Sequence, residues 1–278
     1  MRYPWTLGGL SPSDLLRRTI RESWEDGVFG QGGQMAFYHF LAIFPSLLVL
    51  LAVSARIPQL GDHMTIALQD LSSQILPDQV AQLFQKMMDE LNGRTLSGLQ
   101  LFSVSAGALW AALNGTWAMI YGLNTAYEVK EGRSWRQMAA TIAGLTLSLA
   151  ITGSIAVFLI FGADPQGRLH VWEWIVMCVS LSISFALLYR FAPNVREHEW
   201  RWTLPGALCA LILWIGSTFA ARFYFDHVNN YARSYGHLNG AVMLLLWLYV
   251  TNGAILIGGE MNSEIKKAAV VTRTPSAP

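Results

Sequence analysis

Residues 238–259 read LNGAVMLLLWLYVTNGAILIGG, a run that contains no Asp, Glu, Lys or Arg. At 1.5 Å per residue, a helix of this length spans the roughly 30 Å hydrocarbon core of a bilayer. A helix exposed to water would carry charged or polar residues along one face, and this run has no such face. The stretch therefore predicts a membrane-spanning helix, with the acid Glu260 at its inner end.

The whole chain has the composition of a membrane protein. Of its 278 residues 53% are hydrophobic and only 13% are charged, where soluble domains carry about 25% charged residues. The long apolar stretches do not alternate in polarity as barrel strands do, so helices are the structure that satisfies their backbone in lipid. We predict an all-α integral membrane bundle of six transmembrane helices. The expected spans are 34–55, 99–124, 138–162, 171–191, 204–225 and 238–260.

The distribution of Lys and Arg predicts the orientation. With the N-terminus inside, thirteen basic residues fall in inner segments and six in outer ones, which is the bias of cytoplasmic loops. Six spans place both termini on the same side, so we expect both to be cytoplasmic. Residues 1–33 lack the apolar core and cleavage site of a signal peptide, so the first span is expected to be retained.

The N-terminal segment, residues 1–33, is expected to be cytoplasmic and amphipathic. Leu16, Ile20 and Trp24 recur every four residues beside a basic face, a spacing that predicts a helix on the inner leaflet. The same helix docked on the bundle is an equally good interpretation.

The remaining extramembrane parts are the outer loop 56–98 and the C-terminal tail. Apolar residues at helical spacing predict a helical hairpin in the loop, packed against the bundle rather than a mobile lid. The membrane domain is expected to cover 34–265, and residues 266–278 are expected to form a disordered cytoplasmic tail.

No known catalytic or metal-binding motif is apparent in the sequence. The nearest cluster, Glu197-His198-Glu199, is better explained as a solvated turn, because a metal site needs three or four convergent ligands. A net charge of +1 leaves no basic surface for a nucleic acid. We therefore predict no catalytic residue, no metal, no cofactor and no nucleic-acid partner.

Polar groups on the last predicted helix are candidates for function, because such groups are costly at membrane depth. Asn252 and Glu260 lie eight residues apart, about 80° around a helix, and so share a broad face. This face is expected to carry Tyr249 as well. Close packing of neighbouring helices is expected at Gly253, Gly258 and Gly259.

Other spans add polar candidates to the same path. Asn114 and Asn124 share a face of the second span, and Arg222 and Asp226 lie four residues apart near the outer end of the fifth. Pro45 is expected to kink the first span, because it frees the carbonyl of a preceding residue. The structural alternative is that the amides join helices, the ions pair at the surface and the kink only shapes the bundle.

Several of these stretches carry a family resemblance. The F-P of the first span, the Pro-Gly at 205–206 and the order Tyr-Gly…Trp-x-Tyr…Gly-x-Glu-x-Asn over 235–262 resemble the YihY/BrkB family of bacterial inner-membrane proteins. Gly259 departs from it, since the family more usually has Ala before the Glu. The resemblance implies six helices with cytoplasmic ends in the bacterial inner membrane. The family names, among them virulence factor and the older label ribonuclease BN, imply no settled activity.

The residues together favour an amphiphile as ligand. We expect the protein to bind or transport a lipid or lipid-linked anion through a polar cavity, with membrane lipids as its partners. The alternative is a scaffold or envelope-integrity factor in which every buried polar group only joins helices. The sequence leaves the oligomeric state open.

Overall fold

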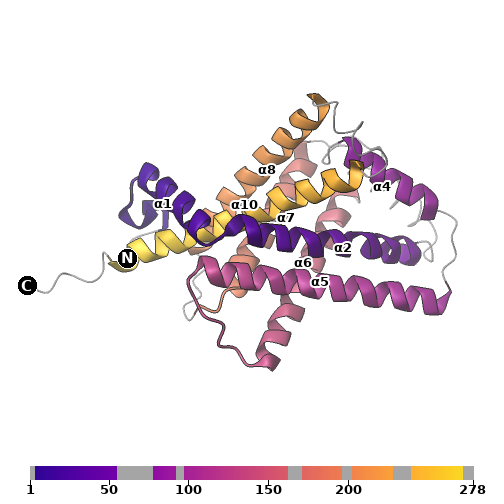
Figure 1. Ribbon diagram of the computed structural model, residues 1–278, viewed down its shortest axis with the longest axis horizontal. Coiled ribbons are helices and arrows are strands. Elements are labelled where there is room, and N and C mark those ends of the chain that lie inside the picture. Colours follow the sequence, from indigo (N-terminus) through magenta and orange to yellow (C-terminus); the bar gives the residue numbers. More distant parts are fainter. Residues whose placement is uncertain are drawn as a thin grey trace, which may run out of the picture.

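The computed structural model describes residues 4–54, 78–91, 97–161, 171–195, 202–227 and 239–271. Within these ranges every regular element is helical, so the predicted all-α class is confirmed for them. Figure 1 shows the arrangement. The elements are η1 (Pro4–Gly9), α1 (Pro12–Glu25), α2 (Val28–Ser54), α4 (Asp78–Leu91), α5 (Gly98–Ala126), α6 (Trp135–Phe161), α7 (Val171–Phe191), α8 (Leu204–His227) and α10 (Asn239–Val271).

Five helices of the described part are long and apolar enough to cross a membrane: α2, α6, α7, α8 and α10. Helix α5 occupies the predicted second span and carries no charged residue over its 29 residues, but it is less apolar and falls outside this group. The described residues therefore yield five candidate spans where the sequence predicted six.

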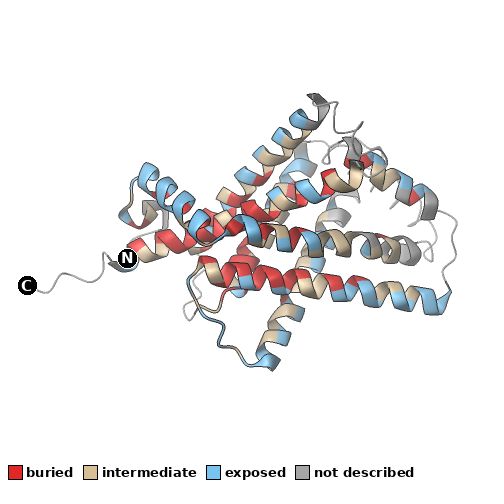
Figure 2. Ribbon diagram, viewed as in Figure 1, coloured by how far each residue is buried: buried red, intermediate tan, exposed pale blue. Residues whose placement is uncertain are grey.

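The long helices pack in a circular order, α2, α5, α6, α7, α8 and α10, with α10 returning to α2. Helix α2 has its most extensive contacts with α5, beside which it lies in Figure 1. The core lies where these helices converge, and Met35, Ile120, Leu188 and Leu256 are fully buried there. Figure 2 shows buried positions concentrated in the same region, whereas α6 exposes most of its surface, as a helix facing lipid would.

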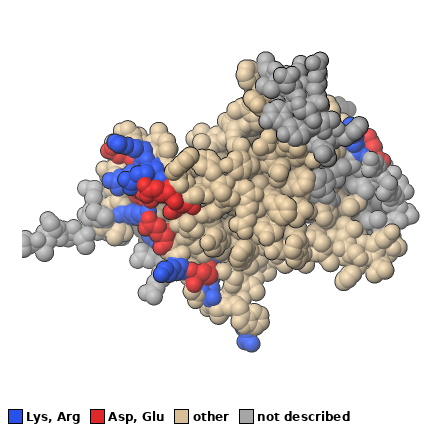
Figure 3. Space-filling view, in the orientation of Figure 1, with Lys and Arg blue, Asp and Glu red and all other residues tan. Residues whose placement is uncertain are grey.

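Charged side chains gather at the two ends of the molecule. On the face shown in Figure 3, most lie at the end that carries α1 and the last turns of α10, and a smaller group lies at the opposite end. The surface between them is uncharged apart from positions that are not described. This distribution is that of a helical bundle with an apolar belt.

Helix α1 is docked on the bundle, which supports one of the two interpretations of the N-terminal segment. Its N-cap is Ser11, whose hydroxyl accepts from the Asp14 amide. The buried face consists of Leu15, Thr19 and Ser23, and it packs on α10 and α2. The predicted apolar stripe faces outward, with Leu16, Ile20 and Trp24 exposed by 62%, 60% and 75%.

Helix α10 is longer than predicted. It ends at Val271 rather than near 260, so residues 266–271 are helical and not part of a disordered tail. The N-terminal segment η1 covers these turns: a Cβ at Gly8 would lie 2.6 Å from the carbonyl oxygen of Ile265, and Gly8 has a φ of +66°. Only glycine fits such a backbone at such a distance. The buried Ala268 explains why the helix continues.

Helix α4 is the described part of the outer loop. Val80 is fully buried in a cluster with Met243, Leu244 and Leu248 of α10 and Ala36 of α2. This helix therefore packs on the bundle. The first arm of the predicted hairpin falls in 55–77, outside the described residues.

Candidate functional site

A line of buried polar residues runs along the second half of α10. Asn252, Glu260, Asn262, Ser263 and Glu264 are each at most 4% exposed. Buried polar groups are costly unless they are hydrogen-bonded, so the partners of each residue indicate its role.

Asn252 lies deepest along this line, where α2, α5 and α10 meet. Its Nδ2 donates to the Leu248 carbonyl at 2.9 Å, within its own helix. Its side chain is also hydrogen-bonded to His39 of α2. The His39 ring lies so close to Gly115 of α5 that a Cβ there would approach it to 2.9 Å. The site thus places an amide and an imidazole side by side within the apolar part of the bundle.

Glu260 lies two turns further along α10 and is fully buried. Its carboxyl group lies within hydrogen-bonding reach of the carboxyl group of Asp26, at the end of α1. Neither carboxylate oxygen of Glu260 has a hydrogen-bond donor, nor has Oδ2 of Asp26. Burial raises the pKa of the Asp26 carboxyl. This contact was not predicted from the sequence, because Asp26 belongs to a segment outside the predicted spans.

Asn262 joins the start of α8 to α10. Its Oδ1 accepts from the backbone N–H of Gly206 at 2.7 Å, and its Nδ2 donates to the carbonyl of Thr203 at 3.2 Å. The first N–H groups of a helix lack partners within the helix, so this amide satisfies one of them. Sequence reasoning missed the role of Asn262, although the Pro-Gly at 205–206 and the Glu-x-Asn order were both noted.

The glycines near Glu260 differ in their surroundings. A Cβ at Gly258 would clash with the Tyr189 hydroxyl and the Gly206 carbonyl, and one at Gly259 would lie 2.6 Å from Leu123 Cδ2. The Tyr189 hydroxyl also donates to the Ile255 carbonyl at 2.6 Å. Gly258 therefore requires glycine, because the Gly206 carbonyl belongs to the backbone, whereas the Leu123 methyl group beside Gly259 ends a flexible side chain that is able to shift. A Cβ at Gly253 would meet nothing within 4 Å, but a Cβ at Gly32 of α2 would lie 3.4 Å from the Gly253 nitrogen, so α2 passes close to this glycine.

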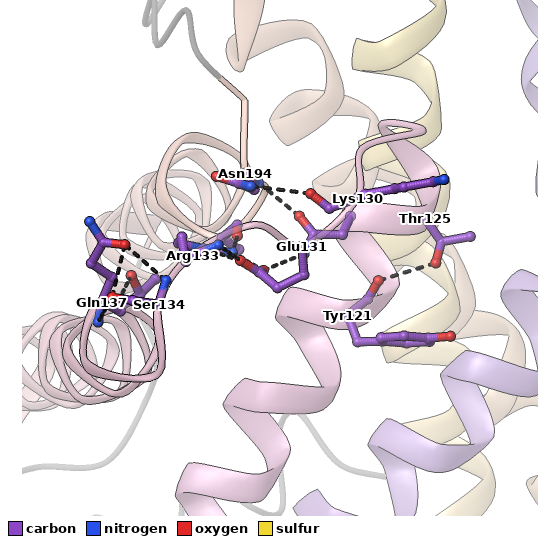
Figure 4. Close-up of polar contacts among 11 residues, drawn as sticks. Tyr121, Thr125, Lys130, Glu131, Arg133, Ser134, Gln137 and Asn194 are labelled. Atoms are coloured by element: carbon purple, nitrogen blue, oxygen red, sulfur yellow. Dashed lines mark hydrogen bonds and ion pairs between the residues drawn. The ribbon is translucent and has the colours of Figure 1, made fainter.

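Asn124 ties the α5–α6 loop to the end of α7. Its Nδ2 donates to Oε2 of Glu131 at 2.8 Å, and its Oδ1 accepts from the backbone N–H of Asn194 at 2.7 Å. Glu131 in turn pairs with Arg133, which donates to the Ala192 carbonyl. Figure 4 shows Glu131, Arg133 and Asn194 of this network. The hydrogen bond from Arg133 lowers the pKa of Glu131 to about 2.

The remaining candidates lie apart from the α10 line. Asn114 donates to the Trp110 carbonyl of its own helix, and Tyr249 is half-buried beside Gly33. Arg222 and Asp226 lie in the last turns of α8, where the Asp226 side chain is outside the described part. Helix α2 continues as one helix through Pro45.

The described residues contain no group of three His, Cys, Asp or Glu side chains that is able to hold a metal. The Glu197-His198-Glu199 cluster lies outside the described ranges.

The similarity of this chain to known proteins extends over most of its length. A family model described as Virulence factor BrkB matches residues 19–278. A ribonuclease-like protein named YfkH from Bacillus subtilis (strain 168) is 31% identical over 253 residues, which cover 85% of this chain and 90% of that protein. A UPF0761 membrane protein of Xanthomonas axonopodis pv. citri is 22% identical over 251 residues, 88% of this chain. This chain spans 59% of the length of that Xanthomonas protein. No solved structure shows a significant match.

Proposed function

The chain belongs to the virulence factor BrkB family, and on this premise we propose that it binds or transports an amphiphile of the membrane, a lipid or lipid-linked anion, at the polar line of α10. It is a multi-pass membrane protein, since its relatives are named as membrane proteins and five of its described helices are long and apolar enough to span a bilayer.

We include α5 as a sixth span in this proposal. It is as long as the candidate spans, carries no charge and packs along α2. Six crossings bring the two ends of the chain to one side, which agrees with the packing of η1 and α1 on the last turns of α10. The basic bias of the inner segments favours the cytoplasmic side of the bacterial inner membrane.

The observation that carries the proposal is the Asn252–His39 contact. Two polar side chains are held within the apolar part of the bundle, each on a different helix. From there, polar groups continue along α10 to the charged end, where Lys267 contacts Glu264 and Glu128 at 2.8 Å each. A headgroup that enters the bundle requires such polar groups, and intramembrane polar residues are functional candidates for this reason.

A scaffold is the second candidate function, and specific contacts favour it. Asn124 and Asn262 have both ends of their amides bonded to protein partners. These two residues join helices and loops, so we leave them out of the proposed ligand site. No catalytic activity is proposed; the ribonuclease-like name is that of the Bacillus relative.

The test uses the full-length protein with variants at Asn252. Purified protein in detergent is analysed by mass spectrometry for retained lipids, and reconstituted vesicles are assayed for movement of a fluorescent phospholipid between leaflets. Asn252→Leu is expected to lose lipid retention or movement while remaining folded, and Asn114→Leu serves as the control because that amide bonds only its own helix. Equal lipid retention and movement in wild type and Asn252→Leu would favour the scaffold.

A further inference from the structure

We propose that Asp26 and Glu260 form a proton-binding site, in which the two carboxyl groups share one proton at neutral pH. The site shares Glu260 with the polar line of α10, but it rests on the contact between the two acids and not on transport. It connects the α1–α2 junction to α10, two parts of the chain more than 200 residues apart in sequence.

The geometry requires a proton between the two acids. Glu260 has no exposed surface, and neither of its oxygens has a donor; Oδ2 of Asp26 is also buried without one. Two ionised carboxylates in this position would repel each other and would both lack hydrogen bonds. One shared proton makes one carboxyl a donor and the other an acceptor, so the contact becomes a hydrogen bond.

The charged groups around the pair add more negative than positive charge. Glu22 of α1 acts on both carboxyl groups, and Glu128 at the end of α5 acts on Asp26. The cation that acts on both, Lys267, is already bonded to Glu128 and Glu264. The phenol of Tyr127 also lies near Glu260; the residue is half-buried, and desolvation raises the pKa of its hydroxyl. These surroundings favour a bound proton over two free charges.

The backbone fixes Asp26 in place. Its N–H donates to the Glu22 carbonyl, and its own carbonyl accepts from Gln31 Nε2 at 2.9 Å. Gly27, the next residue, has a φ of +64°, which lets the chain turn from α1 into α2. The backbone of Asp26 therefore cannot move away from α10 without breaking this turn. Loss of the proton would act directly on the docking of α1 against α10.

The experiment follows protonated carboxyl groups by infrared difference spectroscopy. Full-length protein in phosphatidylcholine–phosphatidylglycerol nanodiscs is titrated from neutral to alkaline pH. We expect a carboxylic-acid C=O band at neutral pH that disappears on the alkaline side. Glu260→Gln and Asp26→Asn are each expected to lose it. Glu25→Gln, an exposed acid one residue from Asp26, is the control and is expected to retain it.

Three outcomes would overturn the proposal. The first is the absence of a carboxylic-acid band from the wild type at neutral pH, and the second is its persistence in both variants. The third is a carboxylic-acid band that is present in choline chloride and absent in sodium chloride when the titration is repeated in both salts. Such a band would mean that the Asp26 and Glu260 oxygens bind a metal cation. If Glu260→Gln fails to fold, Asp26→Asn still decides the result, because Asp26 is only partly buried.

Discussion

Asn262 of α10 accepts a hydrogen bond from the backbone N–H of Gly206 in the first turn of α8, at 2.7 Å. The same amide donates to the carbonyl of Thr203, just before α8 begins. One side chain thus determines how two long helices meet at the charged end of the molecule. The glycine is required at this point, because a Cβ at Gly206 would collide with Asn262 and with the Gly258 carbonyl.

Removing this amide is expected to weaken the fold. Asn262→Ala leaves a buried backbone N–H without its partner, which costs about 1–3 kcal/mol. The melting temperature of the detergent-solubilised protein should fall accordingly. Asn114→Ala is the control, since Asn114 bonds only its own helix. Equal melting temperatures for the two variants would contradict a joining role for Asn262.

The glycines of α10 are expected to respond differently to alanine. Gly258→Ala forces a methyl group against the Tyr189 hydroxyl and the Gly206 carbonyl, and such overpacking costs about 1–3 kcal/mol. Gly253→Ala meets nothing within 4 Å, so it should be neutral or stabilising by up to about 1 kcal/mol, since alanine favours a helix. Thermal unfolding of both variants in the same detergent measures the difference. A destabilising Gly253→Ala would show that the packing described for this position is wrong.

The Glu131 network predicts a specific loss of stability in acid. The folded-state pKa of Glu131 is about 2, below the ordinary value near 4.3 of an unfolded chain. The stabilisation is therefore present above about pH 4.3 and is lost as pH falls towards the folded pKa. Between these two pH values, the free energy of unfolding of Glu131→Gln should change less with pH than that of the wild type. Parallel profiles for the two proteins would contradict the prediction, and Glu25→Gln provides the baseline.

The exposed stripe of α1 is expected to lie in the headgroup region of the inner leaflet. Leu16, Ile20 and Trp24 point away from the bundle, and apolar residues beside a basic face favour such a surface. With Cys178 and Cys209 replaced by Ala, a dye on Ile20→Cys should be quenched by nitroxide lipids in vesicles. Arg21→Cys lies on the basic side of the same helix and should be quenched less. Equal quenching of the dyes at positions 20 and 21 would mean that α1 is docked on the protein and has no side facing lipid.

The sequence was sufficient to predict the long helices, because an uncharged run long enough to cross lipid has few structural alternatives. The predicted boundaries of α7 and α8 agree with the structure to within about two residues, as is usual for helix ends. The end of α10 was missed because its last turns are held by η1, and nothing in the hydrophobic pattern shows which distant segment covers a helix.

The site was predictable only in part. A polar side chain within an apolar run is costly at membrane depth, so Asn252 and Glu260 could be identified from the sequence alone. Their partners, His39 and Asp26, come from other segments of the chain. Such pairings depend on tertiary packing, which helical spacing within one segment does not determine.

The direct test of the account is whether α5 crosses the membrane, because the common side of both termini and the membrane depth of the polar line depend on it. In a chain lacking native cysteines, single cysteines at Leu99 and Lys130 are treated in whole cells with a thiol reagent that does not cross the inner membrane. We expect labelling at position 99 in intact cells and at position 130 only after permeabilisation. Labelling of both positions, or of neither, in intact cells would contradict six crossings.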